Sequence, residues 1–179
     1  MIIQGEILLR SLDGLTPKIH ETAFISEFAY VVGDVEIGEG SSVWPGTVIR
    51  ADSGKITIGK NTCIQDNSVL HGDADVVIGD NVVIGHRVLC HARNVGDRVL
   101  IGNGATINDG VDIGDDSLVA SGSMVLDNFN IPARSKVVGI PGRIRGEVED
   151  RHIKQIKSYC DAYIQKTKRY IRQGNLGTD

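Results

Sequence analysis

The sequence is poor in aromatic residues and cysteine, and each shortage narrows the possible folds. Aromatic residues make up 4% of the 179 residues, against 22 glycines, a balance that favours many short turns over a core built on large rings. The three cysteines, Cys63, Cys90 and Cys160, are too few and too scattered for a disulfide framework, and none forms a CxxC pair. We therefore expect reduced thiols in about one domain, long enough to bury a core.

The chain also lacks an excess of basic residues and a long apolar run. Its formal net charge is -4, so a polyanionic partner such as nucleic acid is not expected. No apolar stretch approaches the ~18 residues that a transmembrane helix needs. The opening residues, MIIQGEILLR, contain neither the basic segment nor the small-residue cleavage site of a signal peptide. These absences predict a protein that makes no membrane contact and resides in the cytoplasm.

What the sequence does contain is a repeat of six residues. Branched apolar residues recur at this interval, with three extra residues after Ile49, two after Leu70 and one fewer after Cys90. The positions are Ile19, Ile25, Val31, Ile37, Val43, Ile49, Ile58, Ile64, Leu70, Ile78, Ile84, Cys90, Val95, Ile101, Ile107, Ile113, Val119, Val125, Ile131 and Val137. A period of six fits neither one amphipathic helix nor a hairpin array. It is typical of a parallel β-helix, in which three hexads complete one triangular coil.

The pattern predicts an all-β solenoid followed by a single helix. In residues 1–146, coils should stack about 4.8 Å apart around a narrow apolar interior. The segment IIQGEILLR should pair as a strand over the first coil. Residues 147–179 lose the hexads, and apolar residues from Ile153 to Tyr170 recur there at intervals of three and four. We expect one long helix in this region, ending near Gly174 and packing back along the solenoid.

Three of the five histidines fall close together, and the hexads place two of them on one face. Because three hexads make one coil, positions three hexads apart stack in successive coils. The residue after an inward branched residue points outward. On one face these outward residues are Arg50, His71 and His91, which should lie one above another.

His86 belongs to a different face. Asp66 occupies the equivalent place one coil earlier, beside Gln65, so a corner of the coil separates His86 from His71 and His91. Zinc takes nitrogen ligands at about 2.0 to 2.1 Å in near-tetrahedral geometry, which is far less than the width of a face. If the three histidines bind one ion, His86 should come from a neighbouring chain, as it would in three solenoids packed around a threefold axis.

At these residues the chain resembles the gamma-class carbonic anhydrase family. The matching segments are SVWPGTVIRAD at 42–52, IQDNSVLHG at 64–72 and VIGHRVLCHA at 83–92, followed by the hexads and VGIPGRIR. The resemblance covers essentially the whole chain. It implies a left-handed β-helix that forms a homotrimer with a zinc, iron or cobalt ion at each subunit interface. It also implies hydration of carbon dioxide to bicarbonate through a metal-bound hydroxide.

The resemblance further implies roles for individual side chains. His71 and His91 resemble the two metal ligands from one chain, and His86 resembles the ligand from its neighbour. Gln65 resembles the residue that hydrogen-bonds the hydroxide, and Tyr163 a tyrosine that overhangs the site.

Three further residues resemble the supporting contacts of that family. Arg50 and Asp66 resemble an ion pair that crosses the interface, and Asp52 resembles part of its support.

The chain departs from the most active members of that family around the site. Only the short segment GDADVV follows the first histidine, so Asp73 and Asp75 are the available substitutes for a proton-shuttling glutamate. Ser53 stands where another glutamate is expected, and Gln165 where the resemblance predicts asparagine. These differences predict slow hydration of carbon dioxide, or none.

Other functions stay open at this point. A coenzyme A-dependent acyltransferase uses the same solenoid, but it needs one unliganded histidine as general base. A metal-dependent acyl-coenzyme A thioesterase would share all the ligands, and a non-catalytic metal-binding scaffold would need only the assembly. Cys90 is expected in the core, whereas Cys63 could lie near the interface and make activity sensitive to oxidation.

Overall fold

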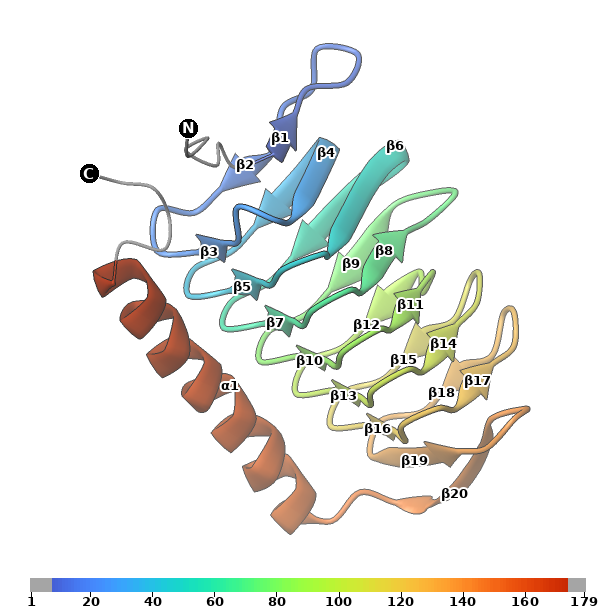
Figure 1. Cartoon of the computed structure of the whole chain (residues 1–179). Helices are drawn as coiled ribbons and strands as arrows, with labels where there is room; N and C mark the ends of the chain where they lie inside the picture. The colour runs from blue at the N-terminus through green and yellow to red at the C-terminus, as the bar shows by residue number, and fades with distance from the viewer. Residues whose placement is uncertain (1–7, 174–179) are drawn as a thin grey trace.

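Short strands wind into a left-handed parallel β-helix, and one long helix lies along its side (Figure 1). The computed structural model describes residues 8–173. Strands of successive coils pair in register, so that Ile49 lies over Leu70 and Leu70 over Cys90. The predicted solenoid is therefore confirmed, with the coil boundaries that the hexads indicated.

One face of the solenoid carries the helix, and we call it the helix face. Its strands are β3 (Phe24–Ile25), β5 (Ser42–Val43), β7 (Cys63–Ile64), β10 (Val83–Ile84), β13 (Leu100–Ile101), β16 (Leu118–Val119) and β19 (Ser135–Val138). The last strand, β20 (Arg143–Glu147), pairs with β19 in the antiparallel sense and ends the stack.

A second face, which we call the histidine face, contains His71 and His91. Its strands are β1 (Leu8–Arg10), the first parts of β4 (Tyr30–Ile37) and β6 (Val48–Ile58), then β8 (Val69–His71), β11 (Leu89–Cys90), β14 (Thr106–Ile107) and β17 (Met124–Val125). The strand β1 lies over the first coil, as predicted. The remainder of the IIQGEILLR segment falls outside the described residues.

The third face completes each coil. Its strands are β2 (Lys18–Ile19), the second parts of β4 and β6, then β9 (Val76–Ile78), β12 (Asn94–Val95), β15 (Asp112–Ile113) and β18 (Asn130–Ile131). The strands β4 and β6 thus run from the histidine face to the third face without a break in strand structure.

Glycine is required where β4 turns this corner. Gly33 has a φ of +87°, and a Cβ there would lie 2.0 Å from the carbonyl oxygen of Ala51 in the coil below. Any side chain would both strain the backbone and collide with the next coil.

The helix α1 (Asp150–Arg172) covers the helix face (Figure 1). Ile156 and Cys160 on α1 pack against Cys63 and Val83 of the solenoid. The helix begins three residues after β20. Its first turn is capped by His152, whose Nδ1 accepts a hydrogen bond from the Glu149 N–H at 3.1 Å.

Four aromatic side chains pack together between the C-terminal half of α1 and the solenoid, two from each. Trp44 lies 5.2 Å from the ring centroids of both Tyr163 and Tyr170, in edge-on arrangements, and 5.0 Å from that of Phe24. Such pairs add stability beyond the area they bury. The helix is therefore fixed along the solenoid at both the Cys160 turn and the Tyr170 turn.

Neighbouring residues of β9 provide a test of the inward and outward alternation. Ile78 is 1% exposed and Val77 is 46% exposed. We expect Ile78→Ala to lower the free energy of unfolding by about 2 to 5 kcal/mol, because it leaves a cavity in a narrow core. Val77→Ala should cost about 1 kcal/mol or less. Urea denaturation followed by circular dichroism measures both; equal losses would contradict the assigned register.

Candidate functional site

His71 and His91 lie against each other on the histidine face, as the hexads predicted. His71 ends β8 and His91 directly follows β11, one coil on. The Nδ1 of His71 lies 2.7 Å from the Nε2 of His91, and the ring centroids are 4.7 Å apart. The His91 N–H donates to the Ile107 carbonyl at 2.9 Å, which fixes the backbone of this position on the next coil.

A carboxylate lies at each end of the histidine pair. The Nε2–H of His71 donates to Asp52 at 2.8 Å, and the Nδ1–H of His91 donates to Asp109. The hydrogen bond from His71 holds the pKa of the Asp52 carboxyl below its usual value, and the Arg50 guanidinium beside it adds to this effect. The four side chains therefore form one hydrogen-bonded chain.

The carboxylates decide which nitrogen of each ring is used at the ends of this chain. Each contact between a ring and an ionised carboxylate uses an N–H, because the carboxylate only accepts. The contact between Nδ1 of His71 and Nε2 of His91 therefore joins the two ring nitrogens that no carboxylate contacts.

Such a pair fits a metal ion after a small adjustment. Two nitrogens bound to a tetrahedral zinc ion lie about 3.3 Å apart, so the rings would separate by about 0.6 Å from their 2.7 Å contact. Imidazole nitrogen is also the donor that zinc favours. Among residues 8–173, however, one chain forms no group of three His, Cys, Asp or Glu side chains able to hold a metal ion.

His86 lies at the corner between the helix face and the histidine face. Its N–H donates to the Asn103 side chain at 3.0 Å, and its carbonyl accepts from Gly104 at 2.8 Å. The next residue, Arg87, turns the corner with a φ of +56°. The imidazole itself is 44% exposed and lies 3.0 Å from Asp66. The corner therefore directs the His86 imidazole outward, and part of the ring is open to solvent.

A cavity of about 370 Å³ runs from His86 to the helix α1. Gln65, Val83, Leu100 and Tyr163 line it, together with polar groups from the following coils. Gln65 is 7% exposed, and its amide nitrogen lies 3.9 Å from the Cys63 sulfur. The predicted site residues therefore lie in two places. His86, Gln65 and Tyr163 line this cavity, whereas His71 and His91 lie on the histidine face.

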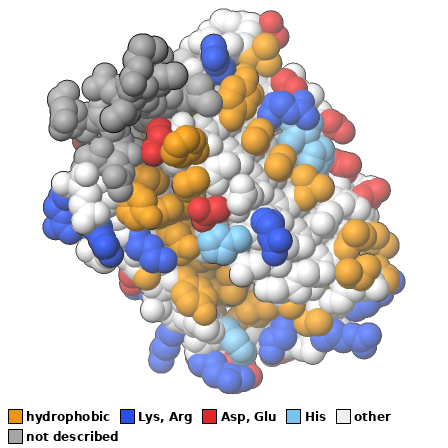
Figure 2. Space-filling model, viewed as in Figure 1, with side chains coloured by type: hydrophobic (Ala, Val, Ile, Leu, Met, Phe, Trp, Pro, Cys, Tyr) orange, Lys and Arg blue, Asp and Glu red, His pale blue; other side chains and the backbone are white. Residues whose placement is uncertain are grey.

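Figure 2 shows one face of the molecule with side chains coloured by type. Histidine side chains appear at separate places on the viewed face, with acidic side chains close by, rather than in one group. The family resemblance implies an ion pair between Arg50 and Asp66, and this pair is not formed within one chain. Arg50 instead pairs with Asp52, and Asp66 lies beside His86.

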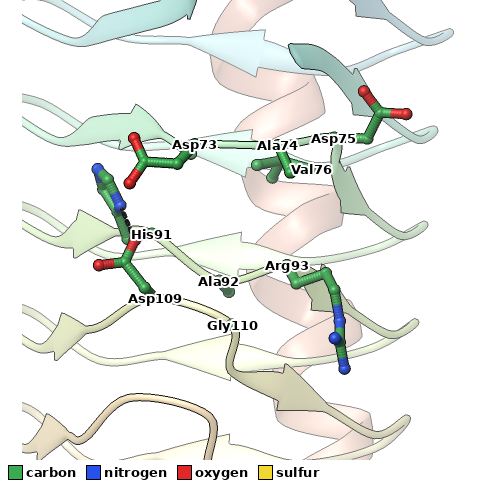
Figure 3. A pocket seen from close by; sticks show the side chains of 10 residues that line it. Asp73, Ala74, Asp75, Val76, His91, Ala92, Arg93, Asp109 and Gly110 are labelled. Carbon is green, nitrogen blue, oxygen red and sulfur yellow. Dashed lines mark hydrogen bonds and ion pairs between the residues drawn. The ribbon is translucent and has the colours of Figure 1, made fainter. Parts of the chain in front are cut away.

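A second cavity, of about 260 Å³, lies beside His91 (Figure 3). Asp73 and Asp75 line it, so the two predicted substitutes for a shuttling acid lie near the histidine pair. Asp109 also lines it, although sequence reasoning did not select this residue. The register of β11 and β14 pairs Cys90 with Ile107, so Asp109 lies two residues beyond the paired position and the hexads alone do not single it out.

Burial protects the cysteines. Cys90 belongs to the core, as predicted. Cys63 is 1% exposed beneath α1, and burial strongly raises the pKa of its thiol. Burial likewise raises the pKa of Cys160 to about 12. Both thiols are therefore protonated at neutral pH, which disfavours the oxidation that sequence reasoning considered for Cys63.

Known proteins are similar to this chain over most of its length. Residues 16–51 and 94–127 match the bacterial transferase hexapeptide (six repeats) family. A carbonic anhydrase of Geobacillus kaustophilus is 36% identical over 159 residues, which span 88% of this chain and 87% of that protein. The mitochondrial gamma carbonic anhydrase 2 of Arabidopsis thaliana is 36% identical over 157 residues, or 83% of this chain. The chain belongs to the gamma carbonic anhydrase family.

Two further facts qualify this membership. The matched region spans 56% of the Arabidopsis gamma carbonic anhydrase, a little over half its length. A solved structure described as a hexapeptide transferase family protein from Anaplasma phagocytophilum matches with a TM-score of 0.88 and 32% identity, over 92% of this chain and 98% of that one. This chain thus shares its fold with a protein described as a transferase.

Within residues 8–173, none of the helical structure is long and apolar enough to cross a membrane.

The half-buried phenol of Tyr163 gives the protein a testable pH dependence. Burial raises the Tyr163 pKa to about 12, with smaller effects from Cys63 and Asp66. Between pH 10 and 12 the unfolded phenol loses its proton while the folded one keeps it, so this contribution to stability is lost as pH rises. We expect the free energy of unfolding to fall less steeply in Tyr163→Phe than in wild type across this window.

Urea denaturation at pH 8, 10 and 11 measures this difference. Tyr159→Phe is the matched control, because Tyr159 lies one helical turn away and is 41% exposed. Its slope against pH should equal that of the wild type. Parallel slopes for Tyr163→Phe and wild type would show that the protein does not shield the phenol from solvent as described.

Proposed function

We propose that this protein hydrates carbon dioxide to bicarbonate with a divalent metal ion held between subunits of a homotrimer. One observation carries the proposal: His71 and His91 are in contact on the histidine face, whereas His86 is exposed at a corner away from them. The family membership supports the activity. The geometry supports the assembly, since a second copy is needed to complete a set of three ligands.

His71 and His91 would hold the ion together with His86 of a neighbouring subunit. When bound, such an ion supplies a Lewis acid that acidifies water near neutral pH. Zinc suits three imidazoles, and iron or cobalt are the other candidates. The cytoplasmic location expected from the sequence stays a prediction.

The cavity residues would prepare the substrate. Gln65 offers a buried amide that can accept and donate hydrogen bonds beside His86. Tyr163 stays protonated at neutral pH, because its pKa is about 12, and so provides a fixed O–H donor. Val83 and Leu100 line the same cavity and give an apolar gas a place without competing hydrogen bonds.

Proton export would be the slow step. Each hydration releases one proton, and the family's acidic loop is reduced here to the segment with Asp73 and Asp75. Both carboxylates line the cavity beside His91 and open to solvent. Turnover is therefore expected to be low compared with family members that carry the full loop.

Single substitutions test the ligand set. We expect each of His71→Ala, His86→Ala and His91→Ala, purified without oxygen, to bind metal at least roughly 100-fold more weakly than wild type. Loss of a hydrogen-bond partner of a ligand already weakens metal binding by about 10- to 100-fold, and loss of the ligand itself should weaken it more. Carbon dioxide hydration should fall with the metal content and return only where metal returns. His20→Ala is the control, since the His20 ring is hydrogen-bonded to Thr22 and takes no part in the contacts of these three histidines. Equal metal content and equal hydration in wild type and His91→Ala would contradict the site.

Mixed trimers test whether the ligands come from two chains. Chains carrying His86→Ala and chains carrying His91→Ala are refolded together in equal amounts. With shared sites, about one quarter of the interfaces combine an intact His71–His91 pair with an intact His86, so metal and activity return to that level. With ligands from one chain, no site is restored. A monomer at micromolar concentration would also contradict the shared geometry.

Chemistry on acyl-coenzyme A is the second candidate. It is favoured by the likeness to a protein described as a hexapeptide transferase, which covers nearly the whole of both chains. Release of free thiol from acetyl-coenzyme A separates the possibilities. Release that is lost with metal removal indicates a thioesterase, and transfer that survives metal removal indicates an acyltransferase. Full metal occupancy with neither reaction would indicate a scaffold.

A further inference from the structure

Asp109 stands at one end of the histidine pair, where its carboxylate accepts the Nδ1–H of His91. It lies in the corner after β14, one coil beyond His91. Figure 3 shows this contact at the wall of the cavity, with Asp73 nearby. Of the described carboxylates, Asp109 alone is hydrogen-bonded to His91.

The corner holds Asp109 in place independently of any ligand. Its carbonyl accepts the Asn128 N–H of the following coil at 2.7 Å. The next residue, Gly110, has a φ of +65°, and a Cβ there would lie 2.4 Å from the Asn128 side-chain oxygen. The tight stacking of these two corners therefore fixes the position from which the carboxylate reaches His91.

The contact decides which nitrogen of His91 is available. A neutral imidazole has one N–H and one lone pair. Because Nδ1–H is donated to Asp109, the lone pair lies on Nε2, the atom that faces His71 across 2.7 Å. Rotation of the ring by half a turn would break the hydrogen bond, so the carboxylate fixes both the tautomer and the orientation of the ring.

We propose that Asp109 is a positioning residue that sets His91 for metal binding through Nε2. This inference rests on the proposed function and deepens it, because it adds a residue outside the recognised ligand set. Asp52 contacts His71 at the other end of the chain, so each imidazole of the pair has its own carboxylate partner.

The test compares zinc affinity in Asp109→Asn and Asp127→Asn. Asp127 occupies the equivalent corner place one coil further on, and no hydrogen bond or ion pair of its side chain is found among residues 8–173. Competition with a chromophoric chelator should show about 10- to 100-fold weaker zinc binding in Asp109→Asn, as for other outer partners of metal-bound histidine. The visible absorption of the cobalt(II) form should change in the same variant. Asp127→Asn should match wild type in both.

Melting temperature and oligomer size of the metal-free variants separate positioning from folding. We expect both to equal those of wild type in Asp109→Asn. Zinc binding that weakens only together with a lower melting temperature or a smaller oligomer would overturn the proposal in favour of a structural role. Unchanged zinc affinity would overturn the role of Asp109 alone, while leaving the proposed function intact. A wild-type protein that binds no zinc, iron or cobalt would overturn both.

Discussion

The site depends on one constraint, the strict register between successive coils. Branched side chains fill an interior too narrow for any shift, and each coil pairs its backbone with the next. An outward residue therefore lies over the outward residue of the neighbouring coil. Arg50 lies opposite His71 in this way, and His91 follows one coil on. No loop is needed to bring the two histidines together, because the stacking of the coils already does so.

The same register explains what could be predicted from the sequence. The hexads identified the inward residues, the three faces and the outward column of histidines, because these follow from counting. The placement of His86 on another face followed from the same count. The repeat does not predict side-chain conformations, however. The hydrogen bonds of His71 to Asp52 and of His91 to Asp109 depend on the rotamers of four side chains and on two corners of unequal length.

The helix shows a second limit of sequence reasoning. Intervals of three and four do not distinguish Tyr159 from Cys160 as the residue that faces the solenoid, and the structure buries Cys160 while Tyr159 is exposed. The low aromatic content suggested a fold without large anchors, which holds for the interior of the solenoid. Yet half of the eight aromatic residues meet outside it, where Phe24 and Trp44 pack with Tyr163 and Tyr170. The hexad repeat indicates that aromatic side chains are absent from the solenoid interior, but it does not predict where on the outside they pack together.

The separation of His86 from the His71–His91 pair has a consequence for mass action. No described part of one chain offers a set of three donors, so in the proposed assembly the ion belongs to the contact between subunits. Dilution that separates the subunits then releases the ion, and an excess of the ion holds the subunits together. Apparent metal affinity becomes a function of protein concentration. In that assembly the rate at which a cell makes the chain, as much as its metal supply, would set how many sites are filled.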